Sequence, residues 1–135
     1  MEKISTQEGR EKIAWLVLRI GVAFCFLYAG IGGFVNPQAW IGWFPKFMKD
    51  IIPGLLLLKM WGVYEIITAL WILSGKYIFI PSLFATFSLA GLLVFNLGSM
   101  DVLFRDVTIL FATATLAIQS FPPKLLEYVT KNPAN

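Results

Sequence analysis

Four long apolar blocks constrain what this chain can fold into more than any other feature of its sequence. They cover residues 13–34, 55–73, 77–97 and 102–121. A helix of about 20 apolar residues is long enough to cross the ~30 Å hydrocarbon core of a bilayer. Of the 135 residues, 58% are hydrophobic and only 14% are charged, whereas soluble chains carry roughly 25% charged residues. The sequence therefore predicts an all-α integral membrane four-helix bundle in a lipid bilayer.

The polar stretches divide the chain into three parts. We expect a cytoplasmic N-terminal segment over residues 1–12, a single four-helix transmembrane domain over residues 13–121 and a cytoplasmic tail over residues 122–135. The first apolar block is longer than the ~7–15-residue core of a signal peptide. It also contains Arg19 and is not followed by an A-x-A cleavage site. We therefore expect it to be retained as a helix.

Residues 35–54 form an interfacial segment between the first two predicted helices. They contain three prolines and two glycines, which interrupt a membrane span. Trp40, Trp43, Phe44 and Phe47 lie there beside Lys46 and Lys49, and tryptophan next to lysine is typical of the lipid headgroup region. The segment is predicted to be a short helix along the outer surface, where it acts either as an anchor or as a lid over a lateral entrance.

Basic residues stand singly at the ends of the apolar blocks and do not form a stripe. The positions are Lys3, Arg10, Lys12, Lys46, Lys49, Lys76, Lys124 and Lys131. This spacing argues against nucleic-acid binding, even though the net charge is +3, because nucleic-acid sites cluster their positive charge. Lysine and arginine are enriched in cytoplasmic loops, so the distribution predicts that both termini are cytoplasmic.

The chain has no histidine and a single cysteine, Cys25. One thiol cannot form an internal disulfide or a C-x-x-C redox pair. Without histidine, ordinary haem ligation and the usual zinc, copper and non-haem iron sites are disfavoured. We therefore expect no metal and no covalent cofactor, and we expect Cys25 to pack as a small apolar side chain.

Charged residues inside the predicted spans are the first candidates for a functional site. A charge at the centre of a membrane helix costs ~2.5–3.5 kcal/mol on insertion scales, so such residues usually face the protein interior and are paired. Arg19 and Glu65 lie about 9 Å and 12 Å from the cytoplasmic ends of their predicted helices, at 1.5 Å per residue. An Arg19–Glu65 ion pair is therefore expected.

A second polar layer is predicted nearer the outer surface. Arg105 and Asp106 open the last block at about the level of Asn96 and Asp101. Either these groups fix helix register as buried pairs, or they bind and protonate a small lipophilic molecule such as a quinone. No catalytic residue is assigned. The candidates for the buried polar core and ligand site are Arg19, Glu65, Asn96, Arg105 and Asp106.

Three stretches of the chain resemble the DoxX/DoxD-like family of small membrane proteins. LRIGVAFCFLYAGIGGFVNP (18–37) is similar to the first helix of that family, and WGVYEIITALWILSG (61–75) is similar to the second. FNLGSMDVLFRDVTILFATATLA (95–117), with its F-R-D motif, resembles the junction of the third and fourth helices. The resemblance runs over about residues 13–121.

The resemblance implies a four-helix bundle in the inner membrane of a prokaryotic cell. It also implies a link to redox chemistry, since family members are subunits of thiosulfate:quinone oxidoreductase and of other membrane oxidoreductase assemblies. The ligand would be a membrane quinone, and a redox partner protein or a small reductant would deliver the electrons to this non-autonomous subunit. By motif position, Arg19, Glu65, Arg105 and Asp106 would form the polar core of the family.

Two other functions fit the same residues. The chain could be a non-catalytic anchor or scaffold that binds its partners within the membrane. It could also be a small carrier or channel; four spans are few for a lone transporter, but a homo-oligomer could form a pore.

Overall fold

The computed structural model describes residues 2–131, and these residues form helices and turns without any strand. The prediction of an all-α chain is confirmed for this part. Residue 1 of the predicted N-terminal segment and residues 132–135 of the predicted tail lie outside the described residues. The α-helices are α1 (Glu2–Val35), α2 (Pro37–Trp40), α3 (Lys46–Ile51), α4 (Gly54–Ser74), α5 (Phe79–Phe95), α6 (Met100–Gln119) and α7 (Pro123–Lys131), with 3-10 turns η1 (Ile41–Trp43) and η2 (Leu97–Ser99).

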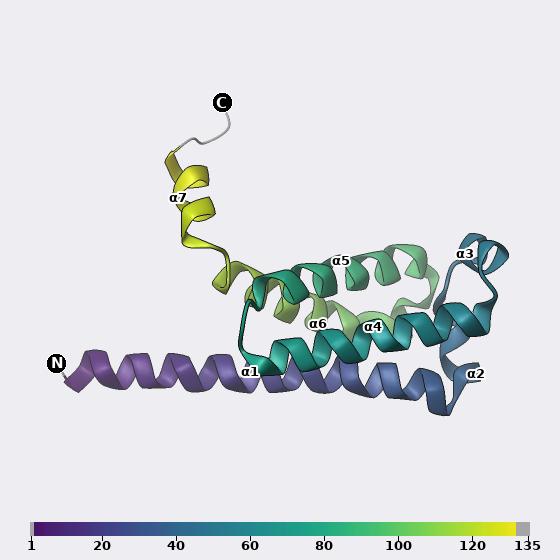
Figure 1. The fold of residues 1–135 in the computed structure, drawn as a ribbon, viewed down its shortest axis with the longest axis horizontal. Helices are drawn as coiled ribbons and strands as arrows, with labels where there is room; N and C mark the ends of the chain where they lie inside the picture. Colours follow the sequence, from purple (N-terminus) through teal and green to yellow (C-terminus); the bar gives the residue numbers. More distant parts are fainter. Residues whose placement is uncertain (1, 132–135) are drawn as a thin grey trace.

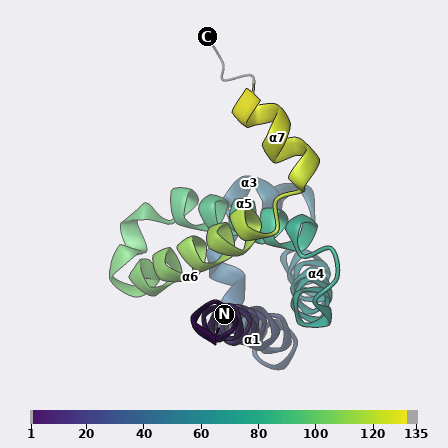
Figure 2. The same cartoon turned by 90° about the vertical axis from the view of Figure 1, so that its left-hand side faces the viewer.

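The long helices are arranged as two packed pairs (Figures 1 and 2). α4 lies antiparallel along α1, and α6 returns along α5. The short helices α2 and α3 lie at one end of the molecule. The beginning of α1, the turn between α4 and α5, and α7 lie at the opposite end.

Two of the described helices are long and apolar enough to cross a membrane on their own. They are α1, over Ser5–Val35, and α4. α5 has 17 residues and is about 26 Å long at 1.5 Å per residue, which is less than the ~30 Å hydrocarbon core. The α5 helix and residues 97–119 qualify only together, as a pair bent by 86°. Length and composition therefore support two spans, or three if the bent pair is one span, where the sequence predicted four.

The first helix is longer than predicted, because residues 1–12 were expected to be a polar lead-in. α1 has 34 residues and extends about 51 Å at 1.5 Å per residue. Its first turns are rich in glutamate, lysine and arginine, which are good helix formers. The helix ends before Pro37, whose ring disfavours the helical conformation at the preceding residue. Asn36 accordingly has φ −137° and ψ 75°.

The predicted cytoplasmic tail contains a helix that the sequence analysis missed. α7 begins at Pro123, where the fixed φ of proline suits the first helical position. Leu125, Leu126 and Val129 form an apolar side of α7, and each is about half exposed. A nine-residue helix spans only about two and a half turns, which is too short for its apolar periodicity to stand out from the sequence.

Small residues hold α1 and α4 in close contact. A Cβ atom built on Gly30 of α1 would lie 2.8 Å from the carbonyl oxygen of Gly62 on α4. A Cβ on Gly62 would lie 2.8 Å from the ring of Phe34 and 3.0 Å from the carbonyl oxygen of Gly30. Glycines of this kind let the backbones of two helices approach closely. This contact fixes which residues of α1 face which residues of α4.

The Gly30→Ala variant is expected to lower the free energy of unfolding by about 1–3 kcal/mol, because the added methyl group overpacks the contact against the α4 backbone. Gly21→Ala on the same helix is the matched control. Its Cβ would meet nothing within 4 Å, and alanine is favoured over glycine in a helix by about 0.5–1 kcal/mol. Chemical unfolding of both variants in detergent measures the difference, and equal stabilities would contradict the close contact.

Candidate ligand-binding cavity

A cavity of about 700 Å³ lies between the two helix pairs. Side chains from α1, α4, α5 and α6 line it, together with five side chains from the segment of residues 40–48. Small-molecule sites are typically ~300–1,000 Å³ and mostly apolar, so its size suits a small ligand. Its aromatic lining consists of Phe24, Phe26, Tyr28, Trp40, Trp43, Phe44, Trp61, Phe87 and Phe95.

Three of the five predicted site residues line this cavity together. Glu65 comes from the middle of α4, and Arg105 and Asp106 come from the second turn of α6. Glu65 and Asp106 are half-buried and Arg105 is exposed. The two polar layers that the sequence placed at different depths therefore contribute to one site, with two carboxyl groups and one guanidinium around an aromatic space.

Aromatic residues and a glycine surround Glu65. Trp61 lies one turn before it on α4 and lines the same cavity. The Trp61 ring packs against Phe44, with ring centroids 5.8 Å apart, and against Tyr64, at 5.1 Å. On the α1 side, a Cβ on Gly30 would lie only 3.2 Å from the Cβ of Glu65. Glu65 thus lies where α1 and α4 approach closely, and its side chain forms part of the cavity wall.

A hydrogen bond joins this part of α4 to α5. The hydroxyl oxygens of Tyr64 and Ser88 are 2.7 Å apart. Ser88 lines the same cavity as Glu65, and its hydroxyl also donates to the carbonyl oxygen of Phe84 on its own helix. The bond links the two helix pairs beside the cavity and orders its wall.

Arg19 does not form the predicted ion pair with Glu65. Its Nε donates to the carbonyl oxygen of Ile72 at 3.2 Å, and its Nη2 donates to that of Leu73 at 3.0 Å. These carbonyls belong to the last turn of α4, which lacks intrahelical donors and attracts positive charge. Arg19 therefore caps α4 and lies outside the cavity.

Gly75 makes room for this cap. It has φ +76°, a left-handed conformation that glycine adopts without strain at a helix C-terminus. A Cβ on Gly75 would also lie 2.9 Å from Nη2 of Arg19. The turn after α4 therefore leaves the space that the Arg19 guanidinium occupies.

The predicted Arg19–Glu65 ion pair was wrong. The sequence gives the depth of each residue only relative to the expected end of its own apolar block, and not relative to the other helix. The contact of Gly30 with Gly62 sets the register instead, and it brings Gly30 beside Glu65 and Arg19 beside Ile72. Ile72 follows Glu65 by seven residues, which is about 10 Å along the helix axis. Nothing in the sequence of either helix alone reveals this register.

Asn96 is also outside the cavity lining. Its Nδ2 donates to the carbonyl oxygen of Leu92 at 2.8 Å and to that of Trp43 at 3.0 Å. The second bond joins the end of α5 to η1, whose Trp43 lines the cavity. Asn96 therefore positions a segment that lines the cavity.

The interfacial segment contributes several side chains to the site that were not among the predicted site residues. Trp40, Trp43, Phe44, Pro45 and Met48 all line the cavity, whereas the sequence left open whether the segment is an anchor or a lid. Cys25 lines it too. In the described part of the chain, no three His, Cys, Asp or Glu side chains gather in a group that could hold a metal ion.

No protein-family model, curated protein or solved structure matches this chain significantly. The similarity to the DoxX/DoxD-like proteins therefore stays a prediction based on the three motifs. The cavity and its charged side chains are the features from which a function can be inferred.

A double-mutant cycle tests the positions of Arg19 and Glu65. Arg19→Gln is expected to lower the free energy of unfolding by about 1 kcal/mol, because α4 loses a charged donor at its C-terminus. The effects of Arg19→Gln and Glu65→Gln should add to within about 0.5 kcal/mol, as for residues that share no contact. A larger coupling, or recovery of stability in the double variant, would show that the two side chains interact.

Proposed function

We propose that this chain is a DoxX-like four-helix membrane protein that binds a membrane quinone in its central cavity, as a subunit of a quinone-linked oxidoreductase assembly. The observation that carries the proposal is the cavity of about 700 Å³, with its aromatic lining and with Glu65, Arg105 and Asp106 in its wall. A redox partner protein would supply the electrons.

The residues that line the cavity suit a flat, mostly apolar ring with polar oxygens. Rings such as those of Trp61, Phe44 and Phe87 offer stacking or edge contacts to another aromatic system. Arg105 offers N–H donors to a carbonyl oxygen. A bound quinone would supply the electron-carrying capacity that these side chains lack.

The carboxyl groups of Glu65 and Asp106 supply the proton chemistry of the proposal. A carboxyl group can hold a proton at its oxygen and release it to a neighbouring acceptor, provided that it lies within hydrogen-bond reach. Because Glu65 is half-buried among aromatic side chains, bulk water has limited access to it. Glu65 would therefore hold a proton for the ligand, and Arg105 would orient the ligand and balance charge.

The outer surface of the helices supports insertion into a bilayer. Large apolar side chains face outward on several helices, including Ile67 of α4 (55% exposed), Phe84 of α5 (58%) and Phe111 of α6 (66%). Contiguous apolar surface of this kind is unfavourable in water and favourable against lipid. α1 and α4 would each cross the bilayer, and α5 and α6 would enter it from the cytoplasmic side and return to that side, which completes the membrane bundle.

The distribution of basic residues supports cytoplasmic termini. The start of α1, the turn after α4 and α7 lie toward the same end of the molecule (Figure 1), and these segments carry the basic residues Arg10, Lys12, Lys76 and Lys124. Lys46 and Lys49 of α3 belong to the opposite end. Since positive charge favours the cytoplasmic side, the first end would face the cytoplasm of a prokaryotic cell.

The quinone content of the protein purified in lipid nanodiscs tests the binding site. The wild type should retain near-stoichiometric quinone, and Glu65→Gln should lower the content about threefold, because an amide N–H is a weaker hydrogen-bond donor than the carboxyl O–H that it replaces. Lys59→Gln is the matched control, because Lys59 is an exposed residue of α4 that does not line the cavity. Its quinone content should equal that of the wild type.

A wild type with no quinone above the lipid background would contradict the proposal and favour the role of a membrane anchor. Equal loss in the Glu65→Gln and Lys59→Gln variants would show that the effect is not specific to the cavity.

Alkaline phosphatase fusions test the orientation. A fusion after Asn135 should be inactive, because the enzyme needs the oxidising side of the membrane, and a truncated fusion after Asp50 should be active. The opposite pattern would place α3 on the cytoplasmic side and overturn the orientation.

A further inference from the structure

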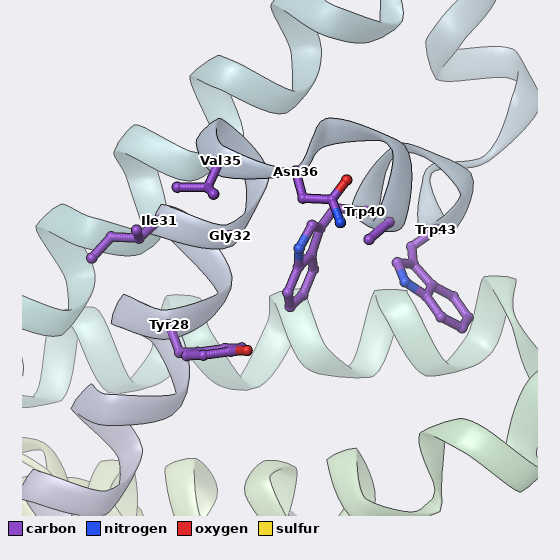
Figure 3. Close-up of a pocket in the computed structure, with 8 residues that line it drawn as sticks. Tyr28, Ile31, Gly32, Val35, Asn36, Trp40 and Trp43 are labelled. Atoms are coloured by element: carbon purple, nitrogen blue, oxygen red, sulfur yellow. The ribbon is translucent and has the colours of Figure 1, made fainter.

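A second, smaller pocket lies beside the central cavity, at the end of α1 (Figure 3). Its volume is about 440 Å³, and its wall is formed by the last two turns of α1 and by residues 36–43. Val35 on its rim is 79% exposed. We call it the outer pocket, and nothing in the proposed function assigns it a role.

The outer pocket and the central cavity share part of their walls. Tyr28, Trp40 and Trp43 line both. In Figure 3 the indole of Trp40 stands between Tyr28 and Trp43. The rings of Tyr28 and Trp40 meet edge to face, with centroids 6.5 Å apart. The two spaces are therefore adjacent, and the side chains of Tyr28, Trp40 and Trp43 separate them.

The position of Trp40 depends on a glycine of α1. A Cβ on Gly32 would lie 2.7 Å from Nε1 of Trp40 and 2.9 Å from two carbons of its indole. The absence of a side chain at Gly32 thus lets the indole lie directly on the α1 backbone. Trp40 is on a helix of four residues, which is joined to α1 through the extended Asn36.

The two spaces differ in polarity. The central cavity has Glu65, Arg105 and Asp106 in its wall. Of the described residues that line the outer pocket, none is charged, and the polar side-chain groups are the Tyr28 hydroxyl, the Asn36 amide and the two indole N–H groups. A charged inner space next to an uncharged outer one matches the two halves of an amphiphilic molecule, because charged side chains favour a polar head and apolar walls favour a hydrocarbon tail.

We propose that the outer pocket is the tail subsite of the ligand site: the head of a tailed quinone lies in the central cavity, and its isoprenoid tail passes Trp40 and lies against Ile31, Val35 and Ala39. This inference rests on the proposed function and adds the class of ligand, a quinone with a long apolar tail. The tail would leave toward lipid past Ile31, which is 46% exposed and lies one turn before Val35 on α1.

Photolabelling in nanodiscs with two quinone probes tests the subsite. One probe carries a diazirine on the quinone head, and the other carries it in the tail, a few carbons from the head. The head probe should label residues of the central cavity, and the tail probe should label the outer pocket at Ile31, Val35 or Ala39. Excess unlabelled tailed quinone should suppress both signals, which separates site labelling from labelling by bulk lipid.

Two variants of α2 sharpen the test. Ala39→Trp fills the outer pocket with a large side chain and should lower competable tail labelling there about tenfold, because overfilling a packed site disfavours a second occupant. Gln38→Trp is the matched control, since Gln38 is exposed on the same helix and lines neither space. The control should label like the wild type.

The outcomes separate this inference from the proposed function. The tail subsite alone would be overturned if the head probe gives competable labelling in the cavity while the tail probe labels lipid-facing residues such as Phe111. Tail labelling unaffected by Ala39→Trp would also overturn it. No competable labelling by the head probe would overturn quinone binding and the tail subsite with it.

Discussion

The contact between Gly30 of α1 and Gly62 of α4 is the constraint on which the other features depend. Because neither residue has a side chain, the helices approach until added Cβ atoms would clash with the opposite backbone carbonyls. In an apolar environment, helix association depends on such packing. The contact fixes one register, which brings Arg19 to the terminal carbonyls of α4 and leaves Glu65 at the cavity wall.

The second helix pair completes the cavity from the other side. The hydroxyl groups of Thr86 and Thr113 meet at 3.1 Å in the interface of α5 and α6, and the rings of Phe79 and Phe121 pack where α5 begins and α6 ends. These contacts orient the second turn of α6, which carries Arg105 and Asp106.

The segment between α1 and α4 has a larger role than its composition indicated. Its proline and aromatic residues are typical of the membrane interface, and the sequence left open whether it is an anchor or a lid. In the structure its indoles line two adjacent spaces, Gly32 accommodates Trp40, and Asn96 holds η1 through the Trp43 carbonyl. Those contacts join residues about 10 to 50 positions apart, and no local pattern encodes them.

The sequence by itself determined the all-helical class, the positions of the helix breaks and the identity of the charged residues in apolar surroundings. Local physics explains this success, since proline and glycine end helices and apolar blocks require burial or lipid. The tertiary structure decided which charges share a site. In the structure, Glu65 lines one cavity with Arg105 and Asp106, whereas Arg19 and Asn96 do not line it. Five residues of the interfacial segment complete the lining: Trp40, Trp43, Phe44, Pro45 and Met48. Register and inter-helix packing set these groupings, because they depend on close contacts between residues far apart in the chain.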